Sequence, residues 1–494
     1  MSEIQDIKER LVLSEIIGQR VKLTPAGAYM KGLCPFHHEK SPSFHVNDQL
    51  GFYKCFGCGE GGDAFSFLEK YEGMTFREAL EYLAGLTGVT LTNRQQTPED
   101  KLRARVLAVL ESAGEFYQKN LDQPVGKPAR DYLQTRGTSQ FLIKLFGLGA
   151  APNDWQALCN HLHAQKFSDK EIVASGMARQ KDTGRIYDTF RGRLMFPLRN
   201  HRGQIVGFSG RQLVANPDEG KYINTPETIV YHKGKMLYGL HEHAGQIRKN
   251  KMMLIVEGEF DMLSSSQAGV DYVCAIKGSA LTEDHANLIA RYTDKVLLAL
   301  DSDGAGINAT KKAIKVLRPH GVDLRVVMVA GGKDPDELAR ADAAAWREQV
   351  KKAVSVYEFF IQVITTSNNI RTIDGQKQAL QQLGQVFPLI DNRLEYEFYL
   401  KKVADILGQD LDVVRADIQQ WGQMSAEKNL LAAARTPVTP TPPKAKPTKR
   451  RRLENYVWFL FLQLLGVQKN VAAGSDYLLK THWETPALQK LSRY

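Results

Sequence analysis

The sequence predicts an α/β protein with several domains, and three observations support this fold class. Between residues 252 and 329, apolar runs alternate with segments of helical periodicity, which indicates a parallel sheet with crossover helices. Between residues 34 and 58, cysteine and histidine occur in closely spaced pairs, which predicts a small metal-binding ribbon. Residues 338–424 have the apolar spacing of helices, and this predicts a helical bundle after the core.

Length and composition limit the class of protein. A chain of 494 residues has room for about three domains, and a hydrophobic content of 43% is that of a globular protein. The formal net charge is +10, but six of these charges lie between residues 444 and 452, so any nucleic-acid surface must be a local patch. Five cysteines suit a metal site in a reducing compartment. The longest apolar run, residues 456–467, is shorter than the roughly twenty residues of a membrane span, so we expect a soluble cytoplasmic protein.

The metal-binding ribbon is expected within residues 1–91. A short amphipathic helix over residues 4–19 and a strand-like segment, residues 20–23, lead into Cys34 and His37, which have the spacing C-x₂-H. Seventeen residues later Cys55 and Cys58 have the spacing C-x₂-C. Two such tight knuckles supply a tetrahedral Cys₃His shell, which predicts one structural Zn²⁺. His38, at C-x₃-H, is the alternative to His37.

Cations and aromatic residues lie between the two knuckles. They could contact phosphates and stack on unpaired bases, or the aromatic rings could form the core of a domain too small to have another. Helices over residues 63–71 and 75–86 are expected to cover the ribbon. The residues concerned are Lys40, Phe44, His45, Phe52, Tyr53 and Lys54.

The whole ribbon resembles the zinc-binding domain of bacterial DnaG-type primases. The resemblance is carried by Cys-Pro-Phe-His from Cys34, by Ser-Phe-x-Val from Ser43, and by Cys-Phe-Gly-Cys-Gly-x-Gly-Gly-Asp from Cys55. The following residues, 92–101, are polar and lack periodicity, which predicts a flexible linker. The zinc domain is therefore expected to move relative to the rest of the chain.

Carboxylates follow two of the apolar runs in the predicted parallel sheet. Glu257 follows residues 252–256, and Asp301 and Asp303 follow residues 296–300. The carboxyl ends of parallel strands meet at one edge, where ligands bind in open α/β sheets. Acids brought together there repel each other unless a cation lies between them, and oxygen ligands with small neighbours suit Mg²⁺. The alternative is a solvated loop, or an N-cap for the helix that follows.

These acids resemble the Toprim domain of primases and of type IA and type II topoisomerases. The resemblance rests on Glu257-Gly-x-x-Asp261 followed by Asp301-x-Asp303-Gly, and Asp334-Pro-Asp336 forms a second acidic cluster at the end of the domain, residues 246–337. Glu257, Asp301 and Asp303 are the catalytic residues that the resemblance implies. They would bind Mg²⁺ or Mn²⁺, with Asp261, Asp334 and Asp336 as supporting ligands. Glu259 stands where the family usually has Tyr.

Residues 102–245 are expected to form the N-terminal part of the polymerase core. Their strand ends and Gly-rich turns carry Arg and Lys, and several segments resemble those that precede the Toprim fold in the same primases. Such cations could bind template phosphates and nucleoside triphosphates along a groove, or be scattered on a solvated face. The expected contacts are Arg136, Arg193, Arg211, Lys221 and Lys233.

The C-terminal part departs from the family pattern. Residues 338–424 are expected to be a helical subdomain that closes the core, and residues 425–452 a linker rich in Pro and basic residues. Residues 453–494 remain, where the family has a longer helical domain that docks on the replicative helicase. Residues 456–467 are apolar on every side, so we expect either a helix that docks on a partner such as the helicase or a remnant packed on its own core.

The resemblance implies a DNA primase: a nucleotidyltransferase that synthesises short RNA primers on single-stranded DNA during replication. Its partners would be the template, ribonucleoside triphosphates, the replicative helicase and a single-stranded DNA-binding protein. It would act as a monomer. The alternatives are a non-catalytic zinc-ribbon and Toprim protein that binds nucleic acid, or a Toprim nuclease. A topoisomerase needs a nucleophilic Tyr on a separate domain, and no such domain follows the Toprim stretch.

Overall fold

The computed structural model describes residues 3–37, 39, 41–91, 97–214, 216, 219–277, 281–300, 304–329 and 334–435. The expected tail and most of the Pro-rich linker therefore lie outside the described residues, as do Asp301, Asp303, His38 and Lys40. The chain divides into two units, residues 1–416 and 417–494. Among the described residues, no helix has the length and apolar character needed to cross a membrane.

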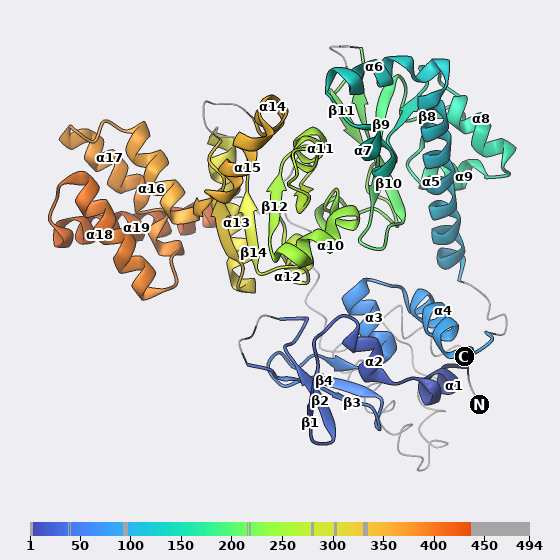
Figure 1. Cartoon of the computed structure of the whole chain (residues 1–494), viewed down its shortest axis with the longest axis horizontal. Coiled ribbons are helices and arrows are strands. Elements are labelled where there is room, and N and C mark those ends of the chain that lie inside the picture. The colour runs from blue at the N-terminus through green and yellow to red at the C-terminus, as the bar shows by residue number, and fades with distance from the viewer. Residues whose placement is uncertain are drawn as a thin grey trace, which may run out of the picture. The chain divides into compact units, whose positions relative to one another are not determined.

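The zinc domain is an antiparallel sheet covered by helices (Figure 1). Two of the aromatic side chains between the knuckles, Phe44 and Tyr53, are fully buried and belong to the core of this domain, whereas Phe52 is exposed. The strands follow the order of the chain: β1 (Thr24–Ala26), β2 (Tyr29–Gly32), β3 (Phe44–Asn47), β4 (Phe52–Cys55) and β5 (Gly61–Gly62). The helices are α1 (Glu3–Arg10), α2 (Leu13–Gly18), α3 (Ala64–Glu72) and α4 (Phe76–Thr87).

The expectation of one helix over residues 4–19 is wrong. The chain breaks between α1 and α2 because Val12 is extended and Ser14 is held by a distant residue: both its backbone N–H and its hydroxyl donate to the carboxylate of Asp48, each at 2.7 Å. Residues 20–23 form no strand either, since β1 begins at Thr24. Asp63 and Thr75 are the N-caps of α3 and α4, close to the predicted helix starts.

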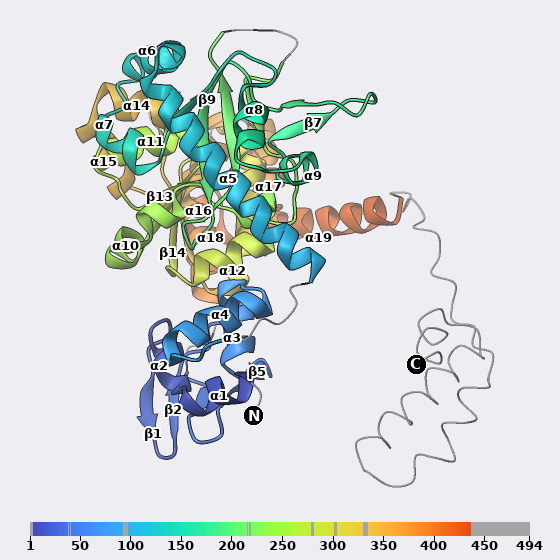
Figure 2. The same ribbon diagram turned by 90° about the vertical axis from the view of Figure 1, so that its right-hand side faces the viewer.

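The linker is shorter than the predicted 92–101. Helix α5 (Pro98–Asp122) begins at Pro98 because Thr97 caps it, accepting from the N–H of Asp100, and because proline and acidic residues favour a first helical turn. Figure 2 shows α5 crossing the N-terminal part of the core, with the hairpin of β7 (Ala178–Gln180) and β8 (Ile186–Asp188) standing out from it. The neighbouring helices are α6 (Lys127–Thr135), α7 (Gln140–Leu145), α8 (Ala157–Ala164) and α9 (Asp169–Ala174).

The N-terminal part of the core contains an antiparallel sheet in the order β11-β10-β9-β6. Its central strands β9 and β10 are buried along nearly their whole length, as their apolar sequence requires. The strands are β6 (Gly149–Ala151), β9 (Arg193–Arg199), β10 (Ile205–Gln212) and β11 (Tyr222–Asn224), and the hairpin is β7 (Ala178–Gln180) with β8 (Ile186–Asp188).

The Toprim part contains the predicted parallel sheet. Strands β12 (Met253–Val256), β13 (Val273–Ala275), β14 (Lys295–Leu298) and β15 (Asp323–Val326) pair in parallel in the order β13-β12-β14-β15. Strand β16 (Val354–Ser355) pairs antiparallel with β15 at the edge of the sheet. The sequence did not predict this strand, because two residues are too few to show an alternation of apolar and polar side chains. The helices are α10 (Leu240–Asn250), α11 (Glu259–Gln267), α12 (Glu283–Ala290), α13 (Gly304–Leu317), α14 (Pro335–Ala341) and α15 (Ala343–Lys351).

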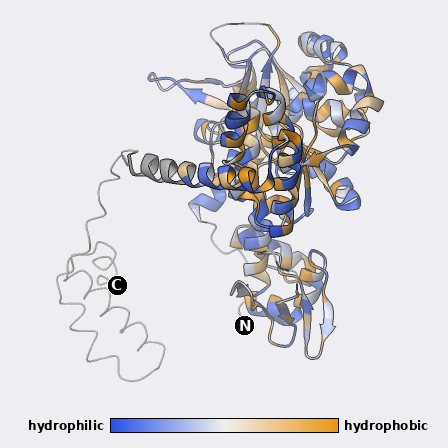
Figure 3. Ribbon diagram, turned by 90° about the vertical axis from the view of Figure 1, so that its left-hand side faces the viewer, coloured by the Kyte–Doolittle hydropathy of each residue, from blue (hydrophilic) through white to orange (hydrophobic). Residues whose placement is uncertain are grey.

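One hydrophobic core joins residues 102–245 to the part that contains the parallel sheet. Buried residues of α5, β9 and β10 belong to the same cluster as those of β12, α11 and α15, whereas the zinc domain has its own cluster. The helical region that follows is confirmed, and Figure 3 shows hydrophobic and hydrophilic residues alternating along the helices, as amphipathic packing requires. Its helices are α16 (Val356–Ser367), α17 (Ile373–Leu383), α18 (Arg393–Leu407) and α19 (Leu411–Arg435).

Candidate metal centres and nucleic-acid interface

The four predicted zinc ligands come together. The ligand atoms of Cys34, His37, Cys55 and Cys58 all lie within 4.8 Å of one another. Tetrahedral Zn²⁺ with Zn–S bonds of about 2.3 Å places two ligand sulfurs about 3.8 Å apart. The Cys34 Sγ to Cys58 Sγ distance is 3.9 Å, and Cys55 Sγ lies 3.7 Å from His37 Nδ1. The donor set and its spacing therefore fit Zn²⁺.

The local sequence explains both knuckles. The N–H of Phe36 points to Cys34 Sγ at 3.4 Å, and the N–H of Cys58 points to Cys55 Sγ at 3.5 Å. Gly57 is required in the second knuckle, because a Cβ there would lie 2.6 Å from the imidazole of His37. Tight turns with inward N–H groups stabilise thiolates, which is the form that binds a metal.

Glu39 is a candidate outer partner of the zinc site that sequence reasoning missed. Its Oε2 lies 3.4 Å from His37 Nε2, so the imidazole has Nδ1 toward the cysteines and Nε2 toward this acid. Glu39 also accepts from the backbone N–H of Cys34 at 2.8 Å and of Ser43 at 2.9 Å. Burial raises the pKa of Glu39, but the hydrogen bonds from Ser43 and Cys34 and the nearby His37 outweigh it, and the pKa is lowered. A carboxylate that orients a ligating histidine is a common outer partner of zinc sites.

The carboxyl end of the parallel sheet, where the sequence places Glu257, Asp301 and Asp303, is called the acid edge below. Glu257 directly follows β12 and is half-buried, and Asp261 lies in the first turn of α11, where its Oδ2 accepts from the N–H of Gly258 at 2.9 Å. Strand β14 pairs with β12 so that Leu298 is opposite Ile255, and the chain beyond β14 leads to Asp301 and Asp303, outside the described residues. Asp334 caps α14 by accepting from the N–H of Glu337 at 2.6 Å.

Asp336 differs from its predicted role as a supporting metal ligand. The side chain is 5% exposed. Its Oδ2 accepts from Arg136 Nη1, and its Oδ1 accepts from Ser264 Oγ and, at 3.2 Å, from Arg340 Nε. These donors, from the C-cap of α6, from α11 and from α14, already satisfy the carboxylate. The geometry therefore supports Asp336 as a link between the N-terminal part of the core and the Toprim part.

Two of the predicted basic residues lie beside the acid edge. The guanidinium groups of Arg136 and Arg211 lie 4.9 and 5.3 Å from the ring centre of Phe260, which follows Glu257 by three positions on α11. Tyr132 lies between them, with its ring centre 5.5 Å from Arg136 and 4.7 Å from Arg211. Stacking on aromatic rings fixes the direction of each guanidinium and leaves N–H groups for further acceptors.

The other basic residues are placed differently. Lys221 is exposed, and Lys233 is half-buried at the start of the 3₁₀ helix Lys233–Lys235, with its backbone N–H donating to Glu227 at 2.8 Å. Arg193 is 1% exposed and donates to the carbonyls of Gly210 and Gly220 and to Glu219. Its donors are used inside the fold, so the expected phosphate contact of Arg193 finds no support in the geometry.

Glu259 has a partner that the sequence did not reveal. Lys277, two residues beyond β13, donates to its Oε1, and both side chains are 5% exposed. Burial raises the pKa of Glu259, but the charge of Lys277 outweighs it and the pKa lies below its ordinary value. The extra acid beside Glu257 is thus neutralised within the fold.

Family models match the chain in the order of its domains. Residues 1–99 match the CHC2 zinc finger, residues 116–244 the N-terminal domain of the DNA primase catalytic core, and residues 254–339 a Toprim-like domain. Residues 357–412 match the DnaB-helicase binding domain of primase. This last match lies in the helices α16–α18 and the start of α19, which the sequence assigned to closing the core, and not in the tail.

Curated relatives and solved structures agree with these matches. DNA primase of Clostridium acetobutylicum is 33% identical over 86% of this chain and 72% of its own length, and that of Pasteurella multocida is 34% identical over 89% and 76%. The Aquifex aeolicus primase structure, with zinc-binding and RNA polymerase domains, has a TM-score of 0.55 and 28% identity over 84% of this chain and 99% of its own. The structure of a DnaG primase catalytic domain bound to single-stranded DNA has a TM-score of 0.55 and 31% identity over 63% and 99%. The chain therefore belongs to the DNA primase family, as the zinc ligands and the acid edge of the parallel sheet had indicated.

Proposed function

We propose that this protein is a DNA primase that joins ribonucleotides into short RNA primers on single-stranded DNA. The observation that carries the proposal is the arrangement at the acid edge: Glu257 ends a parallel strand of a Toprim sheet, and Arg136 and Arg211 lie beside it. Acids that bind a divalent metal next to oriented guanidinium groups are what phosphoryl transfer requires.

Glu257, Asp301 and Asp303 are the proposed ligands of Mg²⁺ or Mn²⁺, with Asp261 and Asp334 in support. Bound there, the metal would activate the 3′-hydroxyl and neutralise charge on the leaving pyrophosphate. Arg211 would bind phosphates of the template or of the incoming nucleoside triphosphate, because its stacked guanidinium directs N–H groups outward. Arg136 donates to Tyr132 through Nε and to Asp336 through Nη1, so it would reach a phosphate through Nη2 alone. Lys221 and Lys233 would extend this cationic path. The zinc domain would bind template.

Primer synthesis tests the proposal directly. The full chain, single-stranded DNA and radiolabelled ribonucleoside triphosphates should yield short RNA products in the presence of Mg²⁺ or Mn²⁺, and omission of both metals should abolish them. Titration of the two ions separately identifies the one that supports synthesis at the lower concentration. Template cleavage without RNA synthesis would instead identify a Toprim nuclease, and template binding without either reaction a non-catalytic protein.

The match at residues 357–412 favours the replicative helicase as a partner. We propose that helices α16–α18 form the contact, and that the tail, residues 453–494, contributes less. Co-sedimentation of the helicase with the full chain and with a chain ending at residue 435 separates the two surfaces. Equal binding by both chains supports the helical contact, and loss of binding in the shorter chain would assign it to the tail.

A further inference from the structure

A small cavity with a cationic lining lies beside the contact between the zinc domain and the polymerase core. We call it the junction cavity, and its volume is about 170 Å³. Its walls come chiefly from the first turns of α5, the end of β9, the β9–β10 turn and residues 230–240, while the end of α3 contributes Glu72 and Gly73. The cations in the lining are Arg103, Arg199, Arg202 and Lys235, accompanied by His201 and His232.

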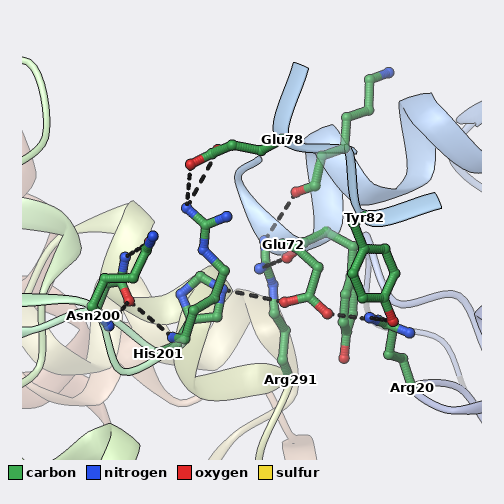
Figure 4. Close-up of polar contacts among 11 residues, drawn as sticks. Arg20, Glu72, Glu78, Tyr82, Asn200, His201 and Arg291 are labelled. Carbon is green, nitrogen blue, oxygen red and sulfur yellow. Dashed lines mark hydrogen bonds and ion pairs between the residues drawn. The ribbon is translucent and has the colours of Figure 1, made fainter. Parts of the chain in front are cut away.

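Glu72 is the one acid among the described residues of the lining, and its charge is already countered. Arg20 of the zinc domain donates to Glu72 Oε1 at 2.6 Å, and His201 Nε2 lies 3.3 Å from Glu72 Oε2 (Figure 4). Burial raises the pKa of Glu72, but His201 and Arg20 outweigh it and lower the pKa to about 2. The carboxylate is therefore ionised at neutral pH, yet it leaves the four cations of the core largely uncompensated.

Acids outside the lining compensate these cations only in part. Arg202 donates to Glu78 at 3.3 Å, and the charge of Arg103 acts on the same carboxylate, so two arginines share one acid. The other two cations have carboxylates at 3.8 and 3.9 Å, which is beyond hydrogen-bond distance. These looser pairs are Arg199 with Glu242 and Lys235 with Asp284. The lining therefore keeps a positive charge that attracts anions.

Three donors of the lining are buried without a hydrogen-bond acceptor among the described residues. They are Arg103 Nε, Arg202 Nε and the hydroxyl of Tyr231. Tyr231 is 1% exposed, and burial raises its pKa to about 12, so its hydroxyl is protonated at neutral pH and can donate. Buried donors are nearly always paired in folded proteins, so three together indicate a site for acceptor atoms.

A small phosphate anion meets both requirements of this site. Its oxygens accept hydrogen bonds from several directions, and arginine donors bind phosphate more strongly than they bind neutral acceptors. Water could accept the same hydrogen bonds, but it carries no charge to offset the cations. The cavity is smaller than the roughly 300 to 1,000 Å³ of pockets for drug-sized ligands, so a whole nucleotide does not fit.

We propose that the junction cavity binds inorganic phosphate or pyrophosphate through Arg103, Arg202 and Tyr231, with Arg199 and Lys235 adding positive charge around the anion. The site is distinct from the acid edge, because the lining contains neither Glu257 nor the basic residues assigned to the cationic path. Pyrophosphate is released by the proposed polymerisation, so the protein would bind its own product away from the metal ligands. The binding itself does not rest on the proposed function.

Titration calorimetry of the full chain with phosphate and with pyrophosphate tests the site. Low salt and the omission of Mg²⁺ and Mn²⁺ prevent binding through metal at the acid edge. The wild-type chain should bind one anion, and the ion with the lower dissociation constant is the ligand. Arg103→Met should weaken binding about tenfold, because it removes a charged donor from the lining. The matched control Lys101→Met removes an exposed cation of α5 outside the lining and should bind as the wild type does.

The cationic path beside the acid edge is the competing site. Arg211→Ala/Lys221→Ala removes two cations of that path and should leave the affinity for the anion unchanged. Loss of binding in this variant together with normal binding by Arg103→Met would place the anion on the path and overturn the proposal. Failure of the wild-type chain to bind either ion at millimolar concentration would overturn it too, since the cavity would then hold water only.

A second variant keeps the test valid if Arg103→Met does not fold, as circular dichroism would show. The side chain of Lys235 is 60% exposed, so Lys235→Ala should fold normally and weaken binding by a smaller factor. Wild-type affinity in Lys235→Ala would then contradict the assignment. A wild-type chain that makes no primer would refute the proposed function and leave the calorimetric result unaffected.

Discussion

At the scale of single residues, charged side chains near the acid edge have two distinct roles. Asp336 is saturated by Arg136, Arg340 and Ser264, so its charge holds parts of the core together. Asp303 follows a parallel strand in a Toprim-like sequence, where acids collect around a metal. Removing a charge should therefore have opposite effects at these two positions.

Asp303→Asn should abolish primer synthesis while leaving stability unchanged or slightly higher. The substitution keeps the volume of the side chain and removes one of several acids that repel each other in the absence of metal. Primer yield and the thermal unfolding temperature, measured without added metal, check both parts. Synthesis at more than a few per cent of the wild-type rate would show that Asp303 is dispensable.

Asp336→Asn should lower the free energy of unfolding of the core by about 2 to 3 kcal/mol, because it leaves two arginines without their negatively charged partner and replaces one of the two acceptor oxygens by an NH₂ donor. Calorimetry of the full chain should show an unfolding temperature a few degrees below that of the wild type. The matched variant Asp334→Asn, at the more exposed cap of α14, should lose less. An unchanged unfolding temperature in Asp336→Asn would argue against the linking role.

At the scale of structural elements, stability is divided between two hydrophobic clusters and a metal site. The zinc domain buries its own aromatic cluster, and its two knuckles depend on the four ligands. The core is held by burial and by pairs such as Arg105 with Glu171, which joins α5 to the start of α9 at 2.6 Å. Perturbations of these elements should remain local.

Cys55→Ala or Cys58→Ala should release zinc and unfold residues 34–60 while the Toprim part stays folded. Metal binding contributes on the order of ten kcal/mol to such small ribbons, and three ligands retain much less of it. Zinc content by mass spectrometry and hydrogen exchange by peptide check this outcome. Cys159→Ala, which removes a buried thiol outside the cluster, is the control that should keep its zinc. Stoichiometric zinc in either knuckle variant would contradict the assignment.

Glu171→Gln should destabilise the protein at neutral pH and have little effect in acid. The hydrogen bond from Arg105 lowers the pKa of Glu171 from 4.5 to about 2. A depressed pKa contributes stability above the unfolded value of 4.5, and that contribution disappears as the pH falls toward 2. Unfolding temperatures of variant and wild type should therefore differ most above pH 5 and converge on acidification. A constant difference across this range would contradict the ion-pair explanation.

At the scale of the whole molecule, the zinc domain, the polymerase core and the helical region occur along the chain in the same order as the matches to the family models. The matched segments end at residue 412, before the Pro-rich linker and the tail. Synthesis on naked template should depend on the zinc domain and the core. Stimulation by the helicase should depend on residues 357–412.

Deletion of residues 436–494 should leave primer synthesis on naked template unchanged and retain stimulation by the helicase. The physical reason is that residues 106–353 bury a large apolar cluster among themselves. Primer yield with and without helicase checks both parts. Loss of basal synthesis would show that the tail belongs to the polymerase core, and loss of stimulation alone would return the helicase contact to residues 453–494.

Local patterns in the sequence determined much of the fold and part of the candidate site. The alternation of apolar runs and helical segments predicted the parallel sheet, since burial on both faces requires continuous apolar strands. The spacing of Cys34, His37, Cys55 and Cys58 predicted the metal cluster, because each knuckle is made within a few residues. The predicted start of a helix was close to the observed start where the sequence has a capping residue directly before the helix, as Thr75 does before α4.

Tertiary structure decided the partners of charged residues. Arg136 and Asp336 lie 200 positions apart, and no local pattern says that they meet. The same holds for Lys277 with Glu259, for Arg193 with distant carbonyls, and for Asp48, which divides the predicted first helix. Secondary structure and knuckles arise from short-range geometry, which a sequence displays directly. The partner of a buried charge is the group that tertiary packing places beside it, and residues far apart in the sequence become neighbours only when the chain folds.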